Sequence, residues 1–299
     1  MMMSNRINFK FFLDQGRSVG SLNAIYDDVD GLTYEIEKIA GELFNKEVIN
    51  GKRILVKPNW VRHSLYPTDD ICLRTHDSFT LATLRALLNY GPEKILLGDA
   101  PIQGCNWEKV VKKGFIDKIV KLSHEYSVPI EIKDFRKTVF DPVLNVRNAI
   151  NTNENDYSVF DLGMKSRLDP ITDPDVNKFR VTDYNPDRMS ESHKKGVHKY
   201  CLLKDLFDYD VIISLPKIKT HQKTGITGAL KNIVGFNGDK DYLPHHRVGS
   251  KENGGDCYPY ENFFRAKAED MIDFANKKRG TVLYKPLRSI ASFSIKQKR

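Results

Sequence analysis

The segments RILVK (53–57), KILLG (94–98) and VPIEI (128–132) decide the fold of this sequence, because each is a short apolar run of the kind that forms buried strands. Between them, the residues from about 77 to 89 and from 106 to 126 carry apolar side chains at helical spacing. Strands that alternate with helices in this way are typical of parallel βαβ units. We therefore predict an α/β fold, with a mostly parallel sheet flanked by helices.

The rest of the chain extends this pattern on both sides. Residues 31–45 predict a helix before the first strand, and DVIISLP (210–216) predicts a strand that returns to the sheet interior. Between these units, residues 134–195 alternate Pro, Asn and Asp with short strand candidates, YSVFDLG (157–163) and KFRVT (178–182), which is typical of an insertion or a lid. Further helices are expected over 224–234 and 260–278, and a basic tail over 279–299. We expect a single α/β domain over residues 1–299.

The composition is that of an ordinary soluble globular protein, with 40% hydrophobic and 29% charged residues among 299. No apolar stretch approaches the roughly 20 residues of a membrane span, and the N-terminus is too polar for a signal peptide. The cysteines, Cys72, Cys105, Cys201 and Cys257, lie far apart in the sequence and form no CxxC pair. We expect a cytoplasmic protein with reduced, buried thiols.

The net charge of +8 is concentrated in the C-terminal part of the chain. Residues 188–299 hold 22 basic and 12 acidic side chains, whereas residues 1–187 hold 25 basic and 27 acidic ones. A bias of this kind attracts anions, whether metabolites, nucleic acid or a membrane surface. The charge alone does not distinguish between these partners.

Three polar motifs follow predicted strands, at the edge where open parallel sheets bind ligands. They are KPNW (57–60), GDAPIQGC (98–105) and PKIKTHQKTGITGALKNIVG (216–235). Lys57 and Asn59 could bind an oxyanion and a hydroxyl group, or be a solvated lysine and a turn residue. Asp99 could ligate a metal, act as a base or cap the following turn.

The third motif is the richest in candidate anion-binding groups. In an extended chain Lys217, Lys219, His221 and Lys223 would share one face, and the following glycines would let backbone amides approach an anion at a helix N-terminus. The alternative is a solvated basic loop with ordinary turn glycines. Further along, LPHHRVG (243–249) adds two adjacent histidines, which would point to opposite faces of a strand, and an arginine that can clamp an anion. His193 and His198 are expected to be lid residues.

These motifs resemble the domain of unknown function 362 family. The resemblance rests on KPNW, GDAPIQGC, VIISLPKIKTHQKTGITGALKNIVG (211–235), HKY (198–200) and DKDYLPHHRVGS (239–250), and spans roughly residues 50–260. The sequence resembles a subtype of this family whose members come from bacterial polysaccharide gene clusters. Members of this subtype continue beyond the last helix here, which implies that a C-terminal portion could be missing. Some members carry iron–sulphur modules, but this sequence lacks their closely spaced cysteines.

The leading hypothesis is an enzyme, or an enzyme-like binder, for a small phosphorylated or carboxylated metabolite, with no reaction class assigned. Proton transfer is assigned to His221 or His246 with Asp99 as partner. The predicted substrate-binding residues are Lys57, Asn59, Lys217, Lys219, Thr224, Gly225, Thr227, Lys231, Asn232, His245 and Arg247. A metal or iron–sulphur accessory protein is the alternative, although the cysteine spacing does not support it. Nucleic-acid binding is less favoured, because no nucleic-acid motif is present.

Overall fold

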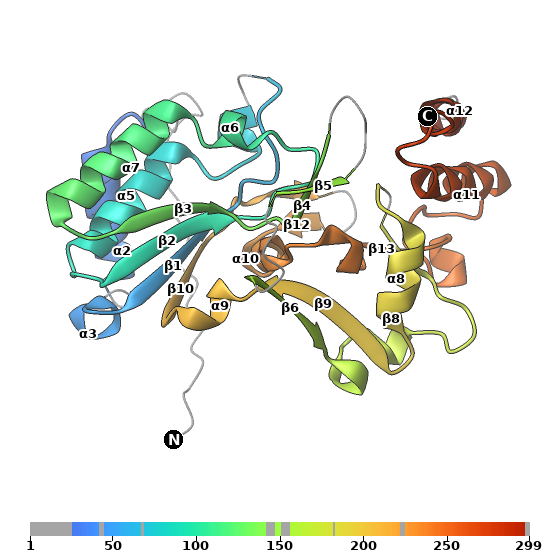
Figure 1. The fold of residues 1–299 in the computed structure, drawn as a ribbon, viewed down its shortest axis with the longest axis horizontal. Helices are drawn as coiled ribbons and strands as arrows, with labels where there is room; N and C mark the ends of the chain where they lie inside the picture. Colours follow the sequence, from blue (N-terminus) through green and yellow to red (C-terminus); the bar gives the residue numbers. More distant parts are fainter. Residues whose placement is uncertain are drawn as a thin grey trace.

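The computed structural model describes residues 26–296, with the exception of 42–44, 67–68, 142–146, 151–155, 182 and 222–224. Its centre is a four-stranded, wholly parallel sheet in the order β10-β1-β2-β3 (Figure 1). The strands are β1 (Arg53–Pro58), β2 (Lys94–Asp99), β3 (Ile130–Asp134) and β10 (Val211–Leu215). The predicted α/β fold with a parallel sheet is therefore confirmed.

The position of β10 differs from the prediction. This strand pairs with β1 alone within the sheet, so it forms an edge, and Ile212 at its centre is 45% exposed. A run of β-branched residues is typical of buried strands, but the sequence does not say which strand has neighbours on both sides. The interior strands are β1 and β2.

Helices cover one face of the sheet. Ile54 and Val56 of β1 pack with Leu84 and Leu87 of α5 and with Phe115 of α7 in one buried cluster (Figure 1). Each such side chain contributes about 1.5–3 kcal/mol when fully buried. The helices on this side are α2 (Val29–Ala40), α3 (Lys46–Ile49), α4 (Asp69–Cys72), α5 (Asp77–Leu88), α6 (Trp107–Val110) and α7 (Lys113–Tyr126).

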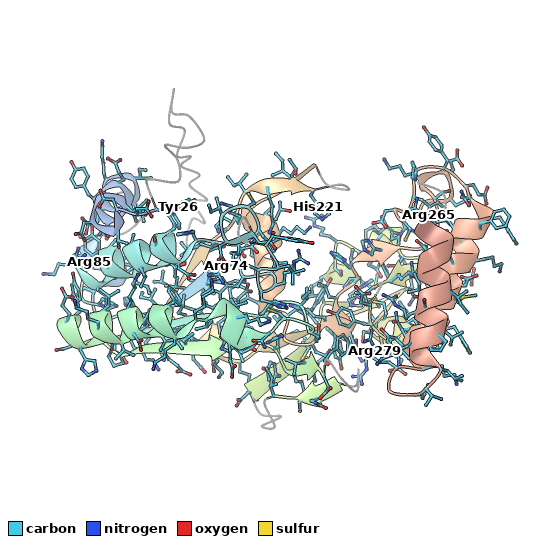
Figure 2. The ribbon with its side chains drawn as sticks, turned by 90° about the horizontal axis from the view of Figure 1, so that it is seen from above. Tyr26, Arg74, Arg85, His221, Arg265 and Arg279 are labelled. Atoms are coloured by element: carbon cyan, nitrogen blue, oxygen red, sulfur yellow. The ribbon has the colours of Figure 1, made fainter. Side chains whose placement is uncertain are left out.

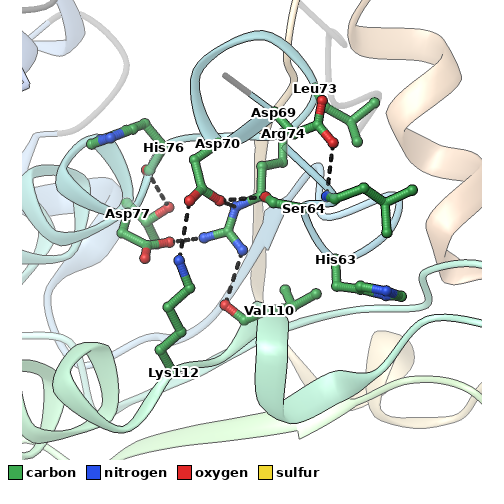
Figure 3. Close-up of polar contacts among 12 residues, drawn as sticks. His63, Ser64, Asp69, Asp70, Leu73, Arg74, His76, Asp77, Val110 and Lys112 are labelled. Atoms are coloured by element: carbon green, nitrogen blue, oxygen red, sulfur yellow. Dashed lines mark hydrogen bonds and ion pairs between the residues drawn. The ribbon is translucent and has the colours of Figure 1, made fainter. Parts of the chain in front are cut away.

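The single helix expected over 106–126 is two helices, because the backbone leaves the helical conformation at Val111 and Lys112. A buried arginine network ties this region to the start of α5 (Figure 3). Arg74 is 1% exposed, pairs with Asp77 and donates to the carbonyl oxygen of Val110 over 2.9 Å. Lys112 joins the network through Asp70, at 3.1 Å.

A second cluster covers the opposite face of the sheet. Leu55 and Leu96 pack there with Phe135, Tyr157 and Leu203. The elements that contribute to this cluster are β6 (Tyr157–Asp161), β9 (Val197–Leu203) and α9 (Asp205–Asp208) (Figure 1). Strand β8 (His193–Lys194) pairs with β9, and α10 (Ala229–Asn232) contacts β10. Part of the segment expected to be an insertion or a lid, residues 134–195, is thus packed into the core.

The remaining elements extend the molecule away from the sheet. They are β4 (Thr138–Phe140), β5 (Arg147–Ala149), β7 (Phe179–Arg180), α8 (Pro186–Ser192), β11 (Lys219–His221), β12 (Gly225–Thr227), β13 (His246–Arg247), α11 (Phe263–Lys277) and α12 (Tyr284–Lys296). Figure 2 shows α11 and α12, marked by Arg265 and Arg279, at the end of the molecule opposite Tyr26 and Arg85. The predicted basic tail is largely the helix α12, which packs against α11.

Two further expectations are wrong. His193 and His198, expected to be lid residues, are 0% exposed and lie against each other, with their Nδ1 atoms 3.4 Å apart. Cys105 and Cys201 are buried as expected, but Cys72 is exposed.

None of the helices in the described part of the chain is both long and apolar enough to cross a membrane.

Candidate functional site

A pocket of about 430 Å³ lies at the carboxyl end of the parallel sheet. It collects side chains from the ends of β1 and β2, from the hairpin β11–β12 and from the segment 231–245. Its polar lining residues are Lys57, Asn59, Asp99, Lys219, Thr220, His221, Thr227, Lys231, Asn232, Lys240 and His245. The three predicted motifs therefore converge on one hollow. Figure 2 shows His221 on the side of the molecule where this hairpin lies.

The floor of the pocket is a buried ion pair. Lys57 Nζ lies 2.7 Å from Asp99 Oδ1, and the two side chains are 1% and 4% exposed. The ammonium group also donates to Asn232 Oδ1 and to the Pro58 carbonyl oxygen, both at 3.0 Å. All three N–H donors of Lys57 are thus engaged. Burial lowers the pKa of Lys57, and the contact with Asp99 opposes that shift.

Asp99 and Asn232 are fixed by further hydrogen bonds. Asp99 Oδ2 accepts the backbone N–H of Trp60 at 2.7 Å. The Asn232 amide donates to the Lys57 carbonyl oxygen at 3.1 Å and to Ser214 Oγ at 2.9 Å. Because buried polar groups are costly unless satisfied, this network holds the three side chains in one arrangement.

The other pocket lysines have no carboxylate partner among the described residues. Lys219 Nζ donates to the Leu73 carbonyl oxygen at 2.5 Å, and Lys240 Nζ donates to the Asn237 carbonyl oxygen at 2.7 Å. Burial, reinforced by the neighbouring charges of Lys231 and Lys217, lowers the pKa of Lys219 to about 8. Burial lowers the pKa of Lys240 to about 7 and also lowers that of Lys231. The pocket therefore holds several desolvated amines around a single acidic side chain.

Apolar side chains complete the wall. Val61, Leu73, Ala100, Pro101, Ile102 and Val234 line the same pocket. The amines therefore occupy only some of the surface of the pocket, and apolar side chains form much of the rest.

Several predicted site residues lie elsewhere. Lys217 precedes β11 and does not line the pocket, and neither does Gly225. The helix expected over 224–234 is shorter than predicted, with four α-helical residues, Ala229–Asn232, followed by a turn of 3-10 helix. Thr224 lies outside the described residues.

The two adjacent histidines do not point to opposite faces. The ring centroids of His245 and His246 are 4.4 Å apart, and His246 Nδ1 lies 3.7 Å from Asp256 Oδ1. Only His245 lines the pocket, whereas His246 and Arg247 lie outside it. Arg247 instead donates to the Ile171 carbonyl oxygen at 2.9 Å. The proton-transfer role assigned to His246 therefore has no support from its position.

Sequence reasoning missed Lys240 and Gly235, which both line the pocket. Lys240 stands in the DKDYLPHHRVGS motif, but a lysine in a loop is ordinarily solvated, so its burial could not be foreseen. Gly235 is the last residue of the motif 216–235, and the presence of a glycine there was the signal of a close backbone approach.

The positions of histidine, cysteine, aspartate and glutamate bear on the metal hypothesis. Across the residues that the structure describes, no three or more of these side chains are grouped as a metal site. Burial raises the pKa of both Cys105 and Cys201 to about 11, so these thiols are protonated at neutral pH.

Part of the chain matches the model of a known protein family. Residues 165–283 match the family model described as domain of unknown function 362 (DUF362). The matched region contains Lys219, His221, Lys231 and Lys240 of the pocket, and Lys57 and Asp99 lie before it. The chain matches no curated protein and no solved structure.

Proposed function

We propose that this chain is an enzyme or an enzyme-like binder that holds a small phosphorylated or carboxylated metabolite in the pocket at the carboxyl end of the sheet. One observation carries the proposal: four lysines line the pocket, and the single carboxylate there, Asp99, is already paired with Lys57. Burying ammonium groups without counter-charges is costly, and an anionic ligand would offset that cost.

The same pocket supplies groups for proton transfer. His221 and Asp99 both line it, and a histidine can exchange a proton near neutral pH. In the proposal, Lys219 and Lys231 bind the negative group of the ligand, Lys57 holds Asp99 in place, and His221 exchanges a proton with the ligand. The apolar wall accommodates the remainder of the ligand.

The proposal is tested by thermal unfolding of the full chain with glucose 6-phosphate, glucuronate and uncharged glucose. We expect the first two, but not glucose, to raise the unfolding temperature, because a ligand that binds only the native state stabilises it. Lys219→Gln and Lys231→Gln should each reduce the shift. Lys121→Gln, on the exposed surface of α7, is the matched control. Equal stabilisation of the wild type and both pocket variants would contradict the proposal.

A further inference from the structure

Lys240 is more deeply buried than Lys219 and Lys231, the other pocket lysines without a carboxylate partner among the described residues. It is 6% exposed, yet it lines the pocket. Its Nζ atom contacts only backbone carbonyl oxygens among the described residues, those of Asn237 at 2.7 Å and Val234 at 3.4 Å. Lys57, by contrast, pairs with the carboxylate of Asp99 at 2.7 Å.

The charges around Lys240 also disfavour its ammonium form. Burial lowers the pKa of Lys240 most, and the positive charges of Lys57 and Arg136 lower it further. The carboxylates of Asp99 and Asp134 oppose this shift. The resulting pKa is about 7. A substantial fraction of the amine is therefore neutral at physiological pH. A desolvated lysine beside another cation is the arrangement that activates amines as nucleophiles.

We propose that Lys240 is a nucleophilic amine that forms an imine with the carbonyl group of an anionic ligand, such as a 2-oxo acid, bound in this pocket. The inference rests on the proposed function, because the carboxylate of the ligand would be held by Lys219 and Lys231. The apolar side chains of Leu73, Ile102 and Val234 would contact its carbon chain.

The chemistry is balanced without a further reactant. The neutral amine attacks the carbonyl carbon, a C–N bond forms, and the carbonyl oxygen is protonated to a hydroxyl group. Loss of that hydroxyl with a second proton releases one water molecule and leaves the C=N bond. No oxidant or reductant takes part, and protons can be exchanged with His221, which lines the same pocket.

The test is to trap the imine. The full chain is incubated with pyruvate and sodium cyanoborohydride, and the labelled lysine is located by peptide mass spectrometry. We expect one reduced adduct per chain, on Lys240, and protection by glucuronate. Lactate, which has no carbonyl group to react, is the negative control. Adducts spread over exposed lysines, with no preference for Lys240, would overturn the inference.

Two variants make the result specific. Lys240→Arg keeps the positive charge but cannot form an imine, so it should lose the adduct, whereas Lys121→Arg, on the exposed surface of α7, should retain it. The wild-type measurement decides the matter even if Lys240→Arg does not fold. If glucuronate raises the unfolding temperature but pyruvate gives no adduct, imine formation is refuted while the proposed anion binding is not. An adduct on Lys240 without stabilisation by any anion would support the reactive amine and refute the proposed anion binding.

Discussion

Gly235 lies directly against Lys57: a Cβ atom at position 235 would stand 2.4 Å from the lysine Nζ and 2.1 Å from Asp99 Oδ1. These separations are far below any contact that two unbonded atoms tolerate. The 3-10 turn after α10, Ile233–Phe236, can therefore close over the ion pair only with glycine at this position. The backbone N–H of Ala100 donates a hydrogen bond to the Gly235 carbonyl oxygen at 3.0 Å, and this bond holds the turn over the ion pair.

We expect Gly235→Ala to separate the pair or displace the turn. Overpacking of this kind costs about 1–3 kcal/mol, and the free energy of unfolding in urea measures it. Gly104→Ala is the control, because a Cβ atom there meets nothing within 4 Å. If the two alanine variants were equally stable, the close approach at Gly235 would have no energetic consequence.

Replacement of Asp99 by asparagine should be among the more damaging changes to the pocket. Asp99→Asn keeps the shape of the side chain but leaves the buried Lys57 ammonium without its counter-charge, which costs about 3–5 kcal/mol. Asp30→Asn is a suitable comparison, because Asp30 also forms an ion pair, with Arg85, but its side chain is 82% exposed. An exposed pair contributes about 0–1 kcal/mol. Urea unfolding of both variants should therefore show a large loss only for Asp99→Asn.

The sequence predicts the layers of this fold better than their details. Residues 53–132 indicate βαβ units because apolar periodicity records which side chains are buried. The edge position of β10 and the helix α12 were missed, because both depend on tertiary neighbours. The convergence of Lys57, Asp99 and His221 could be anticipated, since parallel strands end at one edge. The burial of Lys240 could not, because only the folded chain removes that lysine from water.

Anion binding should weaken as the pH rises, since the proposed ligand contacts require protonated amines. The pKa of Lys219, one of the two lysines proposed to bind the anion, is about 8, so this amine loses most of its charge between pH 7 and 9. The affinity for glucuronate, whose carboxylate is ionised throughout, should fall by at most about tenfold per pH unit for each proton lost. Titration calorimetry measures this. Lys219→Arg stays charged, so its affinity should fall less steeply above pH 8, and an unchanged slope would exclude Lys219 as the responsible group.

The buried His193 should make the fold sensitive to acid. Burial lowers the pKa of His193 to about 4, from an ordinary value of 6.5. The unfolded chain therefore binds more protons between these two values, so this contribution to stability is intact above pH 6.5 and is lost as the pH falls towards 4. The slope for one such group is about 1.4 kcal/mol per pH unit.

Unfolding in urea at several pH values between 4 and 7 would measure this slope. His193→Gln retains an N–H donor for the Tyr242 carbonyl oxygen, which His193 Nε2 contacts at 2.7 Å, but it cannot titrate. We expect this variant to lose part of the acid sensitivity, although it is less stable at pH 7. His124→Gln, on the exposed surface of α7, should keep the wild-type slope. Were the slope the same in all three proteins, the acid sensitivity would have to arise from groups other than His193.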